Sequence, residues 1–168
     1  MQAFDSLSRD IQQYIYDKGW PSLTHIQNAA IKQVANTDHN LILSAPTASG
    51  KTEAAFIPAL NSVEDWETGL KVLYISPLKA LINDQFHRIS ELSEYLDIPI
   101  TRWHGEVSQA QKKKVVNQPK GVLLITPESI EGMLVNRPGE AQHLFKGVEW
   151  IIIDELHSFL GTERGIHL

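Results

Sequence analysis

The sequence predicts an α/β fold in which a parallel sheet is flanked by helices. Short runs of aliphatic residues alternate along the chain with stretches of helical periodicity, and this alternation is typical of parallel sheets. Two of the runs, Val122-Leu123-Leu124-Ile125 and Ile151-Ile152-Ile153, are apolar at every position, as expected of strands covered on both faces. With 168 residues, the chain is long enough for one domain with its own core.

Two amphipathic helices should precede the first strand, separated by Gly19-Trp20-Pro21. Apolar residues recur at helical spacing in each of them. They are Leu7, Ile11, Tyr14 and Ile15 in the first helix, and Ile26, Ala29, Ala30 and Val34 in the second.

Five strands and four further helices are expected in alternation. The predicted strands are Leu41 to Ser44, Lys71 to Ser76, Ile100 to Trp103, Gly121 to Thr126 and Trp150 to Asp154. The predicted helices cover about residues 51 to 61, 78 to 96, 108 to 117 and 128 to 136.

A loop of small residues follows the first predicted strand and opens a helix. It reads Ala45-Pro46-Thr47-Ala48-Ser49-Gly50-Lys51-Thr52. A strand, such a loop and a helix starting at Lys-Thr are the context of a triphosphate-binding P-loop, whose backbone N–H groups surround the phosphates. Lys51 can reach the β- and γ-phosphates, and the Thr52 hydroxyl can ligate Mg²⁺. Ala45 stands where the first glycine is usual, and Ala48 stands mid-loop, where glycine would be easiest.

Two adjacent carboxylates, Asp154 and Glu155, follow the last predicted strand. Ligands of open parallel sheets bind at the carboxyl edge, so Asp154 should emerge beside the P-loop and hold Mg²⁺ together with Thr52. Glu155 can orient and polarise the attacking water. Without the P-loop, the same pair would read as an acidic cap between a strand and a helix.

Two other predicted strands end in similar turns, Ser76-Pro77 and Thr126-Pro127. Each is predicted to be an N-cap hydroxyl followed by proline at the first helical position. Good capping alone explains both turns, and two helix N-termini at the ligand edge could also bind the phosphates of a nucleic-acid backbone. The residues by themselves favour capping over phosphate binding.

Composition narrows the function classes. The chain has no cysteine, which excludes disulfides, thiolate zinc sites and cysteine nucleophiles and favours a reducing, cytoplasmic setting. With a net charge of −5, a nucleic acid would have to be bound by a local basic or helix-dipole surface. No apolar run is long enough to span a membrane and there is no signal pattern, so we expect a soluble protein without a membrane partner.

A tryptophan at the end of a strand and a run of three lysines can each be interpreted in two ways. Trp103 could stack on a base, although a tryptophan at the end of a strand more often belongs to the core. The run Lys112-Lys113-Lys114 favours a solvated helix face over a salt-dependent phosphate contact.

Taken in order, these motifs resemble the first RecA-like domain of a superfamily 2 DExH/DEAD-box helicase. They are Gly19-Trp20 through Thr24-His25-Ile26-Gln27, the loop at 45 to 52, Pro77-Leu78-Lys79-Ala80-Leu81, His104-Gly105, Thr126-Pro127-Glu128-Ser129 and Asp154-Glu155-Leu156-His157. The resemblance covers nearly the whole chain. Within the superfamily, residues 76 to 81 and 154 to 168 are most similar to the Lhr-type (large helicase-related) group, while Ser76-Pro77-Leu78 and Asp84-Gln85 also resemble RecQ-type enzymes.

The resemblance implies ATP and Mg²⁺ as cofactors and DNA or RNA, single-stranded or duplex, as partner. Gln27 would read adenine with Trp20 as a packing partner, although Leu23 stands where many relatives have proline. Lys51, Asp154 and Glu155 would be catalytic, and His157 would relay the nucleotide state to a second domain. The residues implied to hold nucleic acid are Pro77, Leu78, Lys79, His104, Gly105, Thr126, Pro127, Glu128 and Ser129.

The family organisation implies a fragment. Residues 1–36 would be N-terminal helices that carry the adenine-reading motif, and residues 37–168 would be the rest of the same RecA-like domain, incomplete and truncated at its C-terminus. In such sheets a further strand lies between the P-loop strand and the Asp-Glu strand, so we expect a gap there and marginal stability. A second RecA-like domain, which supplies arginine fingers, would not be present in this chain.

The sequence therefore predicts the ATP-binding N-terminal portion of an ATP-dependent nucleic-acid helicase or translocase. One alternative is a non-catalytic module that binds nucleotide or nucleic acid, although such a module would have no need of Glu155. Another is a P-loop motor ATPase that acts in a restriction or remodelling assembly.

Overall fold

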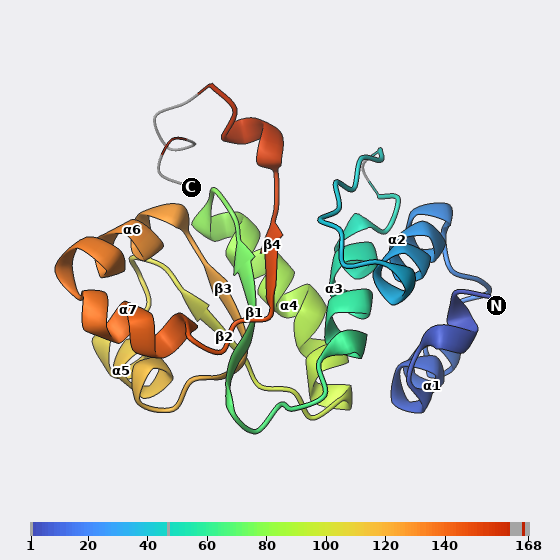
Figure 1. Ribbon diagram of the computed structural model, residues 1–168, viewed down its shortest axis with the longest axis horizontal. Coiled ribbons are helices and arrows are strands. Elements are labelled where there is room, and N and C mark those ends of the chain that lie inside the picture. The colour runs from blue at the N-terminus through green and yellow to red at the C-terminus, as the bar shows by residue number, and fades with distance from the viewer. Residues whose placement is uncertain (1, 47, 162–165, 167–168) are drawn as a thin grey trace. The chain divides into compact units, whose positions relative to one another are not determined.

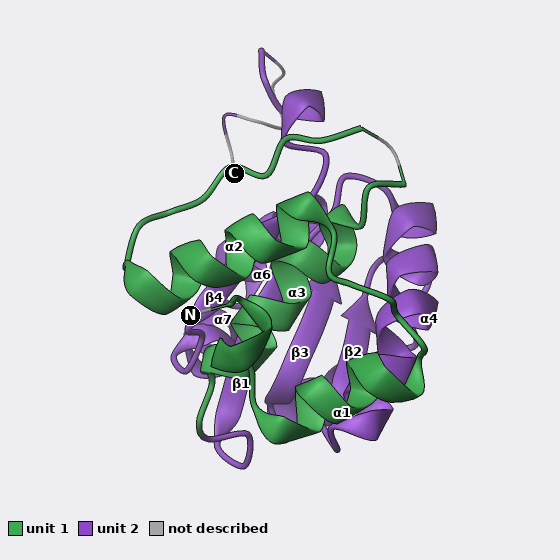
Figure 2. Cartoon of the chain, turned by 90° about the vertical axis from the view of Figure 1, so that its right-hand side faces the viewer, with its two compact units in different colours: residues 1–64 green, residues 65–168 purple. Residues whose placement is uncertain are grey.

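The computed structural model describes residues 2–46, 48–161 and 166 (Figure 1). The chain forms two compact units, and the boundary between them along the sequence lies between Glu64 and Asp65 (Figure 2). The grouping of residues 1–36 with 37–168 in one domain follows from motif order and stays a prediction.

The first unit, residues 1–64, is helical. A short 3-10 helix η1 (Phe4–Ser6) is followed by α1 (Arg9–Asp17), α2 (His25–Asn36) and α3 (Lys51–Ser62). The predicted N-terminal helices and the helix after the P-loop are confirmed. The Ser8 hydroxyl caps α1, and Thr24 with Gln27 forms a capping box at α2.

The strand predicted over Leu41 to Ser44 is wrong. Residues 37–46 form neither helix nor strand, and the Ile42 side chain is 83% exposed. A strand exists only where a neighbouring strand accepts its backbone hydrogen bonds, and no described strand pairs with this run.

The second unit, residues 65–168, contains a four-stranded sheet in the order β2-β3-β1-β4. Its strands are β1 (Gly69–Ile75), β2 (Ile100–Trp103), β3 (Lys120–Ile125) and β4 (Trp150–Ile153), and all neighbours are parallel. The predicted α/β class and parallel sheet are confirmed, with strand ends within two residues of the expected ones.

Four helices join the strands: α4 (Lys79–Tyr95), α5 (Gln109–Asn117), α6 (Pro127–Asn136) and α7 (Pro138–Phe145). Side chains from one face of β1 and β3 form a core with residues of α6 and α7. Trp103 belongs to this core at 4% exposure, so the core reading of Trp103 is confirmed. The helix α7 was not predicted, because it is short and buries few apolar positions.

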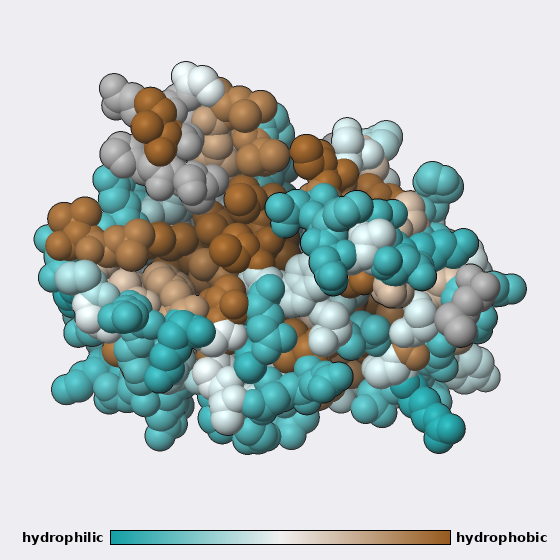
Figure 3. Space-filling model, viewed as in Figure 1, coloured by the Kyte–Doolittle hydropathy of each residue, from teal (hydrophilic) through white to brown (hydrophobic). Residues whose placement is uncertain are grey.

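Strand β4 differs from the inner strands. Strands β1 and β3 are buried almost throughout, as predicted, whereas Ile151 and Ile153 are 59% and 39% exposed. Cover on both faces is therefore a wrong prediction for β4, because it pairs only with β1 and forms an edge of the described sheet. Figure 3 shows hydrophobic side chains gathered at the surface where α6 and β4 lie.

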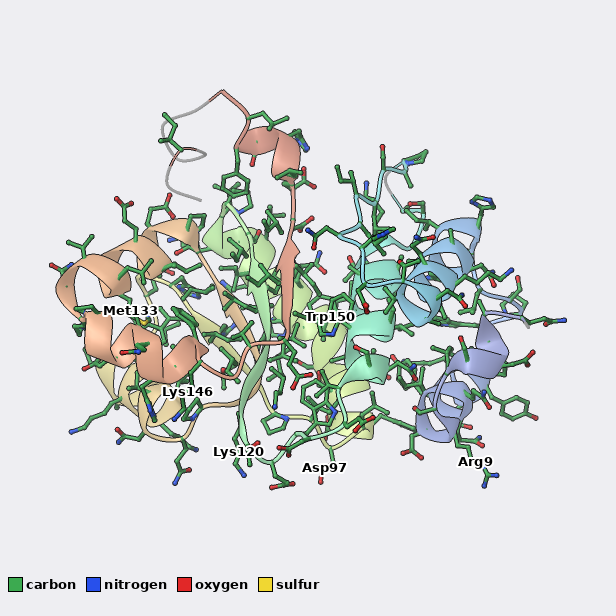
Figure 4. All side chains as sticks on the ribbon, in the orientation of Figure 1. Arg9, Asp97, Lys120, Met133, Lys146 and Trp150 are labelled. Carbon is green, nitrogen blue, oxygen red and sulfur yellow. The ribbon has the colours of Figure 1, made fainter. Side chains whose placement is uncertain are left out.

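The amino edge of the sheet is held by close contacts. The buried Lys71 ammonium lies 2.8 Å from a Glu149 carboxylate oxygen and so ties the start of β4 to β1. Gly121 has a φ of +68°, and a Cβ there would lie 2.0 Å from the Pro99 carbonyl oxygen, so β2 and β3 can approach only because this residue is glycine. Figure 4 labels Asp97 and Lys120 at this edge. The candidate site residues of the second unit follow the strands at the opposite edge.

Candidate functional site

The P-loop lies in the first unit and has the backbone of an anion-binding nest. Ala48 and Gly50 have φ values of +62° and +85°, and Gly50 is the N-cap of α3. Left-handed residues interspersed in a tight loop turn successive N–H groups toward one point, and α3 adds the positive end of its dipole. The Ser49 hydroxyl is buried with no hydrogen-bond partner among the described residues. These features fit a phosphate group.

The charged and hydroxyl side chains of the loop follow Gly50. The Lys51 ammonium donates to the Ala45 carbonyl oxygen at 2.7 Å and so closes the loop on itself. Thr52 is half-buried in the first turn of α3, and Pro46 is exposed. Thr47 lies outside the described residues.

Gln27 is tied to the same loop. It is 4% exposed, its Oε1 accepts from the Thr24 N–H at 2.9 Å, and its Nε2 donates to the Gly50 carbonyl at 3.4 Å. In this structure its amide therefore connects the start of α2 to the P-loop. Trp20 packs edge-on against Tyr14 of α1, with ring centroids 6.3 Å apart.

The acidic motif lies in the second unit and directly continues β4. The Asp154 N–H donates to the Ile75 carbonyl at 2.9 Å, which extends the sheet ladder by one residue. Glu155 then adopts a left-handed backbone with φ +51°, and the chain turns into the 3-10 helix η2 (Leu156–Ser158). The exposed His157 ring lies 3.1 Å from a Glu155 carboxylate oxygen, so the predicted coupling residue contacts the predicted catalytic glutamate.

The Asp154 carboxylate is held by two donors. Its Oδ1 accepts from the Glu155 N–H at 2.9 Å, and its Oδ2 accepts from the hydroxyl of Tyr74. Burial raises the pKa of Tyr74, and the hydrogen bond to Asp154 and the charges of Asp154 and Glu155 raise it further. A metal-binding carboxylate is commonly held in this way by surrounding donors, so Asp154 fits a role as a metal ligand. No group of three metal-binding side chains occurs in the described part of the chain.

The two proline turns differ from each other. Thr126 is the N-cap of α6 with Pro127 at the first helical position, as predicted, but its hydroxyl meets the Ser129 hydroxyl at 2.8 Å. The predicted helix start at Pro77 is wrong. Helix α4 begins at Lys79, because the backbone of Leu78, its N-cap, is still extended with φ −131° and ψ 137°.

Several predicted nucleic-acid residues meet at the carboxyl edge of the sheet. The Lys79 ammonium pairs with Glu106, which follows His104 and Gly105. The Thr126 N–H donates to the Trp103 carbonyl at 3.4 Å. Leu78, Lys79, Gly105 and Glu128 are exposed, whereas Pro77, His104, Thr126 and Pro127 are buried. The exposed members can contact a strand directly, and the buried ones can only shape the surface.

His104 is held by Asn83, a residue that the sequence did not single out. The Asn83 Oδ1 lies 2.9 Å from the Arg102 guanidinium and 3.3 Å from His104 Nε2, and the Glu106 N–H donates to His104 Nδ1 at 3.3 Å. Nδ1 is thus an acceptor, which places the proton on Nε2. Burial lowers the pKa of His104, and the Arg102 charge lowers it further.

The sequence reasoning missed Tyr74, Asn83 and Glu106. A signal existed for Tyr74, because a hydroxyl within an otherwise aliphatic strand requires a partner once it is buried. The predicted solvated helix face of the lysine run is wrong for Lys112, because this side chain is buried and its ammonium lies 5.8 Å from the Trp103 ring centroid.

None of the described helices combines the length and the apolar character needed to cross a membrane.

Comparison with known proteins places these motifs in a family. The chain is 29% identical to the ATP-dependent helicase Lhr-Core of Methanocaldococcus jannaschii, over 99% of the chain and 21% of that protein. It is 35% identical to the Lhr helicase/uracil glycosylase of Escherichia coli, over 86% of the chain and 11% of that protein. The chain thus spans about a fifth or less of the length of these curated relatives.

Solved structures of helicases are also similar to this chain. Helicase Lhr of Mycobacterium smegmatis, bound to ssDNA and AMP-PNP, aligns with a TM-score of 0.86 at 28% identity, over 99% of this chain and 22% of that one. The DEAD-box helicase Mss116 bound to ssRNA and UDP-BeF aligns with a TM-score of 0.83 at 21% identity, which shows the RecA-like fold alone. The expected fold and the similarity to Lhr-type helicases are confirmed. The model of the DEAD/DEAH box helicase family matches residues 24–168, and the chain therefore belongs to that family.

Proposed function

We propose that this chain is the ATP-binding portion of an ATP-dependent nucleic-acid helicase or translocase. The observation that carries the proposal is the loop before α3, where Ala48 and Gly50 have left-handed backbones and the buried Ser49 hydroxyl has no hydrogen-bond partner among the described residues. Membership of the DEAD/DEAH box helicase family supports a triphosphate as the ligand. A cytoplasmic location is part of the same proposal.

In the proposed site, each polar residue has one task. Lys51 stabilises the charge of the β- and γ-phosphates, and Gln27 with Trp20 selects adenine. Thr52 and Asp154 hold Mg²⁺, which when bound neutralises charge on the phosphate oxygens. Glu155 orients the attacking water and accepts its proton.

The nucleic-acid surface is proposed at the carboxyl edge of the second unit. Lys79, Gly105 and the start of α6 at Thr126 would contact one strand through its backbone. The Lys79–Glu106 ion pair lies on this surface with both side chains more than half exposed, so a phosphate can replace Glu106 as the partner of Lys79. His157 would pass the nucleotide state from Glu155 toward a second RecA-like domain.

The test is ATP turnover by the intact protein, with and without single-stranded DNA or RNA. We expect nucleic acid to stimulate turnover, and we expect Glu155→Gln to lower the stimulated rate by about 10² to 10⁴ while nucleotide still binds. Glu94→Gln, an exposed substitution on α4, is the matched control and should leave the rate unchanged.

Other results would select the alternatives. Nucleotide or nucleic-acid binding without turnover would favour the non-catalytic module. Turnover that neither DNA nor RNA stimulates would favour a motor of a restriction or remodelling assembly.

A further inference from the structure

Tyr74 and Asp154 meet because of the register between β1 and β4. Tyr74 lies opposite Ile152 in the parallel pair, and Asp154 follows two residues later on the same face of β4. Diagonal neighbours of this kind are about 7 to 8 Å apart at the backbone, a span that an aromatic side chain can bridge. The Tyr74 hydroxyl reaches Asp154 Oδ2 in this way.

The tyrosine is well suited to hold a carboxylate in place. Tyr74 is 3% exposed, and its ring is fixed within the sheet. The ordinary pKa of a tyrosine is about 10, so at neutral pH the hydroxyl keeps its proton and is a donor. A neutral donor orients the carboxylate but leaves its negative charge in full, whereas a lysine or arginine would offset the charge that attracts a cation.

The two donors fix the orientation of the Asp154 carboxylate. An ionised carboxylate has about four acceptor positions, and Tyr74 and the Glu155 N–H each occupy one. The carboxylate cannot turn without breaking one of these bonds. Its other acceptor positions then stay available to a cation in one fixed orientation of the carboxylate.

We propose that Tyr74 is a positioning residue that orients Asp154 toward the Mg²⁺ of a bound nucleotide. This role rests on the proposed function and adds a residue outside the recognised motifs. Partners that hold a ligating carboxylate typically change metal affinity by about 10- to 100-fold when they are removed.

The test replaces Tyr74 by phenylalanine in the intact protein, which removes one oxygen and keeps the ring. Mn²⁺ serves as the probe, and its binding is followed by electron paramagnetic resonance in the presence of a non-hydrolysable ATP analogue. Tyr74→Phe should weaken Mn²⁺ binding by about 10- to 100-fold. Tyr95→Phe, at the 44% exposed end of α4, removes the same oxygen elsewhere in the second unit and should leave Mn²⁺ binding unchanged.

A second comparison asks whether the effect passes through the carboxylate. In an Asp154→Ala background, adding Tyr74→Phe should cause no further loss of Mn²⁺ affinity, because the group that Tyr74 orients is gone. A further loss of tenfold or more in that background would contradict the proposal.

A measurement that keeps the hydroxyl at position 74 covers the case in which Tyr74→Phe fails to fold. Fluorotyrosine placed at position 74 should shift its ¹⁹F resonance when Mg²⁺ is added to the protein with the nucleotide analogue, and Asp154→Ala should abolish the shift. An unmoved resonance, or full Mn²⁺ affinity in Tyr74→Phe, overturns the role of Tyr74 alone. If the unsubstituted protein binds no nucleotide-dependent Mn²⁺, the proposed function fails as well.

Discussion

Unusual backbone conformations gather at the candidate site. In the described ranges, the non-glycine residues with positive φ are Ala48, Asp97 and Glu155, and two of these three belong to the predicted motifs. Such a conformation costs about 1 to 2 kcal/mol and persists only where the surroundings hold it in place. The P-loop and the turn after β4 are therefore strained where the proposed chemistry takes place.

Gly50→Ala tests this strain. Gly50 has a φ of +85°, and a Cβ there would lie 2.5 Å from Gln27 Nε2, so both the backbone and the bond to Gln27 would have to change. We expect the free energy of unfolding to fall by about 1 to 3 kcal/mol and nucleotide affinity to fall with it. Urea unfolding and titration with a fluorescent nucleotide would measure the two effects.

Gly132→Ala is the control for that substitution. Gly132 lies within α6, and a Cβ there meets no atom within 4 Å. Alanine should raise the free energy of unfolding by about 0.5 to 1 kcal/mol, since glycine is unfavourable inside a helix. Equal stability of the two variants would contradict the conformational role of Gly50.

At the scale of elements, the sheet has a buried interior and an open edge. The aliphatic runs of β3 and β4 look alike in sequence, yet β3 pairs on both sides while β4 pairs only with β1. The same hydrophobic pattern therefore contributes different amounts to stability.

Leu123→Ala and Ile151→Ala measure that difference. Leu123 is fully buried in the core, so its truncation should lower the free energy of unfolding by about 2 to 5 kcal/mol. Ile151 is 59% exposed, and its truncation should cost less than about 1 kcal/mol. Chemical denaturation of both variants gives the values, and similar losses would show that β4 is covered as deeply as β3.

At the scale of the whole molecule, the two halves of the proposed ATPase site lie in different units. The P-loop belongs to residues 1–64 and the Asp-Glu pair to residues 65–168. The relatives are about five or more times longer than the matched region, and the family resemblance assigns the arginine fingers to a second domain. Fast hydrolysis would then require more than these 168 residues.

The 168 residues alone should consequently bind ATP but hydrolyse it slowly. An arginine finger accelerates phosphoryl transfer by about 10³ to 10⁵, and we expect turnover to be lower than that of the intact protein by a factor in this range. Single-turnover hydrolysis at saturating ATP, compared with nucleotide affinity, would test this. Turnover equal to that of the intact protein would place every catalytic group within the 168 residues.

The sequence by itself determined the fold class, the inner strands and the order of the motifs. Each of these depends on a pattern of residues close together in the sequence. Apolar periodicity distinguishes helix from strand, a run of small residues predicts the P-loop, and two carboxylates directly after a strand predict the acidic motif. Residues such as Lys51, Asp154 and Glu155 could be predicted as site residues in this way because the proposed chemistry requires a particular residue type at a particular spacing.

Only the tertiary structure decided which segments have partners. Leu41 to Ser44 has the composition of a strand, but no described strand pairs with it, and α4 starts only at Lys79 because the backbone of Leu78 is still extended. The bond from Tyr74 to Asp154 joins residues 80 positions apart through the register of β1 and β4. Hydrogen bonds between distant segments depend on which strands become neighbours, and the local pattern of a sequence does not contain that information.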